Sequence, residues 1–198
     1  LRYLKGRPRY RLWFGYQKAP SAITVWTDSE FAGCKKSRKS TSAGVLMLGA
    51  HTTKTWSTNQ AVLALSSGEA EYYAIVKAAS VALGIRSLAA DLDIKFECAI
   101  SIKSDASAAI GISSRVGIGK VRHIEVTQLW VQEKVASGEI VIEKVATEDN
   151  LADALTKAVD AQIIQKHVLG TGAEILSDRH PLTPKIDEEN GGAIDDEE

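Results

Sequence analysis

Residues 64–75 constrain the chain most, because they predict a helix start that carries two carboxylates. Ser66 is a favourable N-cap, and Glu69 three residues later completes a capping box. An apolar face then repeats at helical spacing, at Tyr72, Ile75, Val76, Ala79 and Leu83. Capping accounts for Glu69. Glu71 lies one position from the apolar face, where a carboxylate needs a partner or a metal.

Three further acids lie where they can join Glu71. Asp28 ends a short β-rich run, and Asp105 ends a second run of the same shape. Asp153 lies in the first turn of a helix expected over residues 150–166. Acids at strand ends and helix starts can converge on one hard cation, so these four carboxylates are the candidate site.

Five motifs resemble, in order and spacing, the ribonuclease H domain of copia-type retrotransposon Pol polyproteins. They occupy residues 26–33, 38–44, 65–72, 122–124 and 151–157. The resemblance runs from about residue 1 to about residue 159 and implies a C-terminal fragment of such a polyprotein.

The resemblance also implies a mechanism. In ribonuclease H enzymes the acids of the first strand, the helix, the fourth strand and the last helix hold divalent ions. These match Asp28, Glu71, Asp105 and Asp153, which would hold two Mg²⁺ ions, with Mn²⁺ as the alternative. The implied activity is metal-dependent cleavage of the RNA strand of RNA–DNA hybrids. The implied partner is the upstream reverse transcriptase region of the same polyprotein.

Each acid also has a structural interpretation. Asp28 could be a turn residue, Asp105 could cap a short helix, and Asp153 could serve only the helix dipole. Glu69 could replace Glu71 as the ligand, because the phase of a helix is uncertain in a sequence.

Substrate contacts are expected from polar and basic residues near the acids. They are Ser29, Lys36, Arg38, Asn59, Ser67, Arg122 and His123. The loop before the last expected helix has no His, as in copia-type relatives. His123 is an unfavoured substitute, since a His at a helix start is more often structural.

The periodicity predicts a mixed α/β fold in the order βββαβααβα. Strands are expected over 23–28, 43–50, 52–58, 98–103 and 139–146, and helices over 67–92, 106–112, 123–136 and 150–166. Three antiparallel strands and two parallel ones, flanked by helices, match the ribonuclease H-like fold.

The net charge of −1 hides a division of the chain. We expect residues 1–20 to be a basic remnant of the upstream region with a linker, residues 21–166 to be the ribonuclease H-like domain, and residues 167–198 to be a flexible acidic tail. The basic clusters are either nucleic-acid footprints or solvated loops.

Cys34 and Cys98 have no metal-finger spacing, which favours a reduced intracellular protein. No signal peptide or membrane-spanning run is expected, so the cytoplasm or the nucleus is predicted and no membrane partner. The competing hypothesis is an inactive or domesticated retrotransposon relic that acts as a nucleic-acid-binding or interaction module. All four acids are present, which favours the enzyme.

Overall fold

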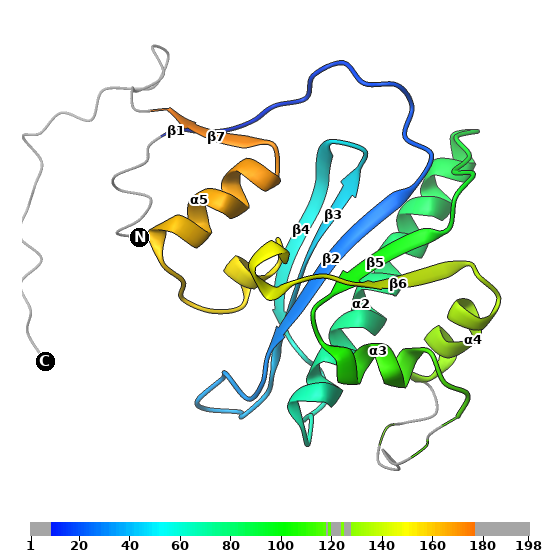
Figure 1. The fold of residues 1–198 in the computed structure, drawn as a ribbon, viewed down its shortest axis with the longest axis vertical. Helices are drawn as coiled ribbons and strands as arrows, with labels where there is room; N and C mark the ends of the chain where they lie inside the picture. Colours follow the sequence, from blue (N-terminus) through cyan, green and yellow to red (C-terminus); the bar gives the residue numbers. More distant parts are fainter. Residues whose placement is uncertain (1–8, 118, 120–123, 125–127, 177–198) are drawn as a thin grey trace, which may run out of the picture.

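The computed structural model describes residues 9–117, 119, 124 and 128–176 (Figure 1). The main sheet is formed by β2 (Ile23–Glu30), β3 (Thr41–Leu48), β4 (His51–Asn59), β5 (Ile100–Ser104) and β6 (Ile140–Lys144). Its strand order is β4-β3-β2-β5-β6. β3 pairs antiparallel with β2 and β4, whereas β5 pairs parallel with β2 and β6. The predicted ribonuclease H-like α/β class, with its mixed five-stranded sheet, is confirmed.

Gly44 in β3 leaves room for an aromatic side chain from the next strand. β3 is buried along nearly its whole length, and Trp56 of β4 lies against it. A Cβ atom at position 44 would lie 2.1 Å from Cζ2 of Trp56, closer than packed atoms approach. Glycine is therefore required where the indole crosses the strand.

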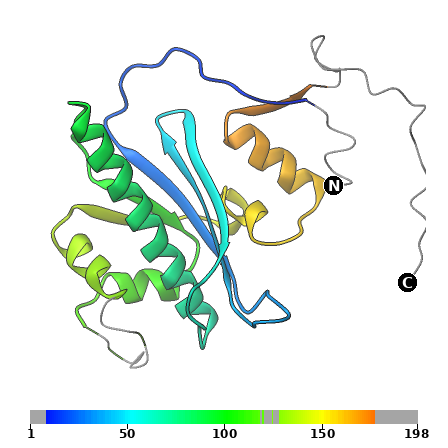
Figure 2. The same ribbon diagram turned by 180° about the vertical axis from the view of Figure 1, so that it is seen from behind.

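The helix α2 (Ser67–Asp91) crosses one face of the sheet (Figure 2). It runs unbroken through Gly84 and matches the helix expected over residues 67–92. Tyr72 and Ile75 are fully buried in the core that α2 shares with Val25 and Ile102. By length and composition alone α2 could cross a membrane, contrary to the sequence expectation, but the core helix of a soluble protein meets the same criteria.

Two short helices, α3 (Ser107–Ser113) and α4 (Trp130–Ala136), lie near β6. The first matches its prediction. The second is shorter than the helix expected over 123–136, and residues 123 and 125–127 lie outside the described part of the chain.

The prediction of one helix over residues 150–166 was wrong. The structure has two 3₁₀ turns, η2 (Thr147–Asp149) and η3 (Asp153–Leu155), followed by α5 (Ala161–Gly170). Side-chain hydroxyl groups donate hydrogen bonds to backbone carbonyls that would accept from backbone N–H groups if the helix continued. Thr156 Oγ1 donates to the Asp153 carbonyl at 3.1 Å, and Ser57 Oγ of β4 donates to the Leu155 carbonyl at 2.7 Å.

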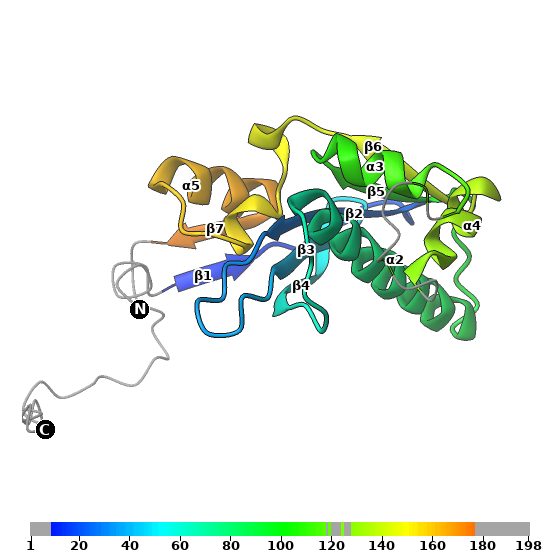
Figure 3. The ribbon, with the colours of Figure 1, turned by 90° about the horizontal axis from the view of Figure 1, so that it is seen from below.

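A two-stranded antiparallel ribbon, which the sequence did not predict, joins β1 (Arg9–Leu12) and β7 (Ala173–Leu176). With α5 it lies at the β4 end of the molecule, opposite α4 (Figure 3). Regular structure therefore lies on both sides of the predicted 21–166 boundaries. The first eight residues and the tail from residue 177 lie outside the described chain.

Candidate active site

The start of α2 separates the roles of its two carboxylates. Ser66 is the N-cap, and its hydroxyl accepts the Glu69 N–H at 3.2 Å. The Glu69 carboxylate accepts the backbone N–H of Leu65 at 2.8 Å and the hydroxyl of Tyr73 at 2.7 Å. Glu69 is thus engaged in capping. Glu71, and not Glu69, lies with Asp28 and Asp105, so the geometry favours Glu71 as the candidate ligand.

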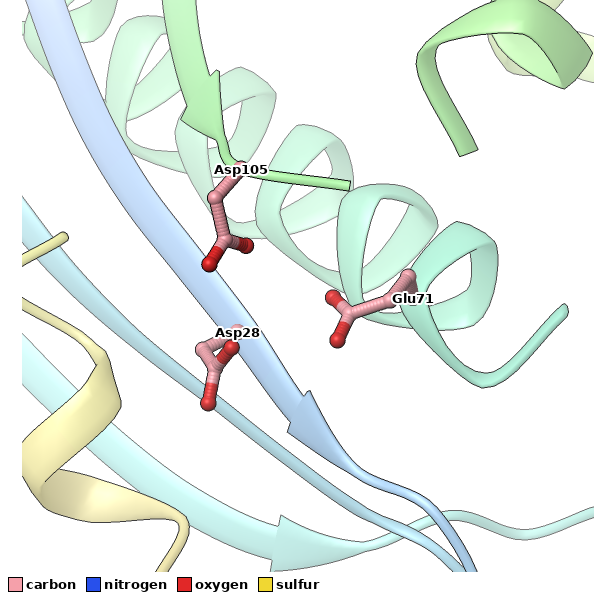
Figure 4. Close-up of side chains that lie close together, drawn as sticks. All are labelled: Asp28, Glu71 and Asp105. Carbon is pink, nitrogen blue, oxygen red and sulfur yellow. The ribbon is translucent and has the colours of Figure 1, made fainter. Parts of the chain in front are cut away.

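Three carboxylates from three elements converge beside the sheet (Figure 4). Asp28 lies near the end of β2, Asp105 directly follows β5, and Glu71 comes from α2. Because β2 and β5 are parallel neighbours, their carboxyl ends meet at one edge. One ligand oxygen from each side chain lies within 4.8 Å of the others. Asp105 does not cap α3, whose N-cap is Ala106.

Burial, together with neighbouring like charges, raises the pKa values of two of these acids. Burial, then the charge of Asp28, raises the pKa of Glu71 to about 8. Burial raises the pKa of Asp28 to about 6, against the hydrogen bond from Thr156 and the charge of Lys157. Glu71 Oε2 is buried with no hydrogen-bond partner among the described residues. A cation bound among these oxygens would offset both their burial and their mutual repulsion.

Asp153, the fourth predicted acid, lies beside this group and outside its 4.8 Å limit. It is on η3 and only 6% exposed, and its charge contributes to the raised pKa of Asp28. Its Oδ1 forms an ion pair with Lys157 Nζ at 2.6 Å, and this contact, with nearby Asp28 and Asp105, raises the pKa of Lys157. The Lys157 ammonium group therefore places a positive charge beside Asp153 and near Asp28 and Asp105.

Two residues that contact the acids were missed in the sequence. Thr156 Oγ1 donates to Asp28 Oδ2 at 2.5 Å, and Lys157 pairs with Asp153. Both lie in the motif at 151–157, so the signal was present, but only a tertiary contact distinguishes them from ordinary residues of an exposed turn. Ser29 donates its backbone N–H to Glu71 Oε1 at 3.3 Å, and its hydroxyl is buried.

The predicted substrate-binding residues are dispersed. Lys36 and Arg38 are exposed on the loop between β2 and β3, and Ser67 is exposed at the start of α2. Asn59 ends β4 and accepts a hydrogen bond from Thr41 at 3.2 Å. Arg122 and His123 lie outside the described residues.

Asn59 also lines a pocket of about 370 Å³ between the end of β4, α2 and the start of α4. Tyr73, Lys77 and Trp130 are among the other lining residues. Gln60 in its wall donates to Ser42 Oγ at 2.9 Å and to the Ala70 carbonyl at 2.8 Å. Its Oε1 is buried and has no hydrogen-bond partner within the described chain. The pocket therefore has aromatic and cationic side chains in its wall, with the Gln60 amide held in place at its edge.

The donor set fits a hard divalent cation. Asp28, Glu71 and Asp105 are the one such group of three found in the described part of the chain, and it contains only carboxylate oxygens. Magnesium and manganese prefer oxygen ligands, whereas softer ions prefer His or Cys.

Comparison with known proteins gives relatives of one kind. No protein-family model matches the chain. The Pol polyprotein of transposon RE1 from Arabidopsis thaliana is 30% identical over 166 residues, 83% of this chain and 11% of that protein. The Pol polyprotein of transposon TNT 1-94 from Nicotiana tabacum is 30% identical over 161 residues, 80% of this chain and 12% of that protein. The chain thus spans about a ninth of these relatives.

Similar solved structures include the N-terminal RNase H domain of rv2228c from Mycobacterium tuberculosis, with a TM-score of 0.46 and 16% identity over 76% of this chain and 96% of that one. LC11-RNase H1 in complex with an RNA/DNA hybrid has a TM-score of 0.44 and 18% identity, and the match covers 67% of this chain and 92% of that one. At these scores the sheet topology and the sequence relatives carry the assignment. The chain is homologous to a segment of the retrovirus-related Pol polyproteins of transposons, and it has the ribonuclease H-like sheet topology.

Proposed function

We propose that the chain is a metal-dependent endoribonuclease that cleaves the RNA strand of RNA–DNA hybrids. The observation that carries the proposal is the convergence of Asp28, Glu71 and Asp105 within 4.8 Å, together with the buried, unpartnered Oε2 of Glu71 in the described structure. A purely structural trio of acids would have donors or basic partners for each buried oxygen.

Asp28, Glu71 and Asp105 would hold Mg²⁺ or Mn²⁺, with Asp153 completing the set for a second ion. The bound ions would activate a water and neutralise the leaving oxygen. The protein's own groups prepare the ligands. Ser29 N–H orients Glu71, and Thr156 Oγ1 fixes one oxygen of Asp28 and favours its ionised form.

The surroundings of the acids suit a two-stranded nucleic acid. Lys36 and Arg38 are exposed on a loop that follows β2, the strand of Asp28, where they can contact phosphates. The pocket with Gln60 lies along α2 from Tyr73 onward, whereas Glu71 faces the acids, so two strands could lie on neighbouring faces of this helix. The aromatic side chains of its wall suit stacking against a sugar or a base.

We further propose that the hybrid reaches the site from a reverse transcriptase region of the same polyprotein. The relatives are Pol polyproteins, and the chain matches about a ninth of their length. In such a protein one chain would make the hybrid and then degrade its RNA strand.

The test is incubation of the purified chain with a labelled RNA–DNA hybrid, with and without Mg²⁺, beside an Asp28→Asn variant. Asparagine retains an oxygen for the Thr156 hydroxyl but lacks the charge. Cleavage that requires both the metal and Asp28 is expected. If a chain shown to be folded cleaves nothing, the relic or binding-module hypothesis replaces the nuclease, and hybrid affinity against salt becomes the measurement.

A further inference from the structure

The segment of residues 147–157, here called the Asp153 segment, has little regular structure to hold it in place. It contains the two three-residue 3₁₀ turns η2 and η3, whose hydrogen-bond geometry is poorer than that of an α-helix. The sheet holds one side of it. Asn150 Nδ2 donates to the Thr27 carbonyl at 3.0 Å, and Thr156 contacts Asp28. Both of these contacts are with β2, so the side of the segment that faces away from β2 must be held by another element.

Helix α5 supplies that support. His167 Nδ1 lies 2.6 Å from the Leu151 carbonyl, so it donates as the Nδ1–H tautomer. Lys166 Nζ pairs with Asp149 at 2.8 Å. Gly170 lets the helix come close, since a Cβ there would lie 2.4 Å from Cδ2 of Leu151. The C-terminal half of α5 therefore contacts the Asp153 segment.

Helix α5 is itself tied down at its C-terminal end. Thr52 Oγ1 of β4 donates to the carbonyl of the buried Thr171 at 2.8 Å. The chain then enters β7, whose strand partner in the described structure is β1. The ribbon continues past β1, because Trp13 N–H donates to the Gly172 carbonyl at 2.9 Å.

We propose that β1 is a strap that holds α5 beside β4 and, through α5, positions the Asp153 segment at the candidate active site. This inference rests on the proposed function for its catalytic meaning. It gives residues 9–13, which were predicted to be an upstream remnant, a role in positioning the carboxylate of Asp153. The contacts form one chain of links, from β1 to β7, from β7 to α5, and from α5 to Leu151 and Asp149.

The register of the ribbon shows where to break it. Trp13 and Gly172 form a hydrogen-bonded pair, and such pairs alternate along an antiparallel ladder, so Arg11 and Glu174 form the next one. Arg11→Pro removes that N–H. Arg11→Ala is the matched control, because it loses the same side chain, including its ion pair with Glu174, and keeps the backbone donor.

The experiment is hydrogen exchange on the full chain. In Arg11→Pro the amides of Asp153 and Leu155, which bond within the segment, should exchange at least tenfold faster, with β2, β3 and α2 within twofold of the parent. Arg11→Ala should resemble the parent. If the chain cleaves hybrids, kcat should fall at least tenfold in Arg11→Pro with KM within twofold. If the chain does not cleave hybrids, the hydrogen-exchange rates alone test the inference.

A second pair of variants tests the contact between α5 and the Asp153 segment, which His167 makes with the Leu151 carbonyl. His167→Ala should speed exchange in the Asp153 segment while β1 and β7 stay protected, and His167→Asn, whose amide can donate to Leu151, should restore protection. The strap is refuted if β1 and β7 lose protection while the segment keeps its parent rate. A uniform rise across the sheet and α2 refutes it equally, since that would be general destabilisation.

Discussion

Replacing Glu71 with glutamine should stabilise the metal-free protein while it removes a metal ligand. The amide has the same shape as the carboxylate. Its oxygen can still accept the Ser29 N–H, and its NH₂ group can donate toward Asp28 and Asp105, where the carboxylate repels them. Stability and metal binding should therefore change in opposite directions.

The size of the gain follows from the raised pKa. The pKa of Glu71 is 4.5 in the unfolded chain and about 8 in the fold. At roughly 1.4 kcal/mol per pKa unit, ionised Glu71 costs the fold at most about 5 kcal/mol. A folded pKa above the unfolded one means that this cost is absent below about pH 4.5 and grows until about pH 8. Because solvent reaches part of the side chain, we expect a gain of about 2–4 kcal/mol at pH 8 and under about 1 kcal/mol at pH 5.

Thermal unfolding in EDTA between pH 5 and pH 8 measures this gain. At about 2–4 °C per kcal/mol for a chain of this size, the melting temperature of Glu71→Gln should rise by roughly 5–15 °C at pH 8. Glu69→Gln is the matched control on the same helix, because its carboxylate already accepts from Leu65 and Tyr73. It should not raise the melting temperature. A Glu71→Gln variant no more stable than the parent at pH 8 would refute the electrostatic account of the site.

Three further outcomes are expected. Mg²⁺ should raise the melting temperature more at pH 8 than at pH 5.5, because at the lower pH the ion must displace protons from Asp28 and Glu71, whose pKa values are about 6 and about 8. Thr156→Val, which removes the donor to Asp28, should weaken Mg²⁺ binding in calorimetry about tenfold and move its onset to higher pH; unchanged binding would show that the contact does not orient the ligand. Gly44→Ala should cost about 1–3 kcal/mol in urea unfolding, because its Cβ would meet Trp56, and Gly44→Ala with Trp56→Leu should recover part of it.

The part of the site that the sequence predicted is the part with strong local signals. Ser66 and Glu69 mark the start of α2, and β-branched runs end at Asp28 and Asp105, so three acids could be placed on known elements. Parallel pairing of β2 and β5 then brings the strand ends together without further information. The competition between Glu69 and Glu71 and the capping role considered for Asp105 needed the structure, since both depend on the partners that each side chain meets.

The part that failed depends on contacts distant in the sequence. The apolar pattern after Asn150 is compatible with a helix, but Thr27, Ser57 and Asp28 bind the backbone and side chains there and hold two short turns instead. The ribbon is harder still. Its strands have four residues each, and Arg9 pairs with Leu176 across most of the chain. Short edge strands of that kind have no local signature beyond alternation.

The same pairing brings the entry and exit of the described chain to one point, with Arg9 directly opposite Leu176. A domain whose two ends adjoin can be inserted into a longer protein without separating the sequences on either side. It also tolerates rewiring: a short glycine linker from residue 176 to residue 9, with new termini at the exposed turn of Gly138, should give a circular permutant with the same sheet. The adjoining ends thus make the described fold self-contained with respect to the sequences that flank it.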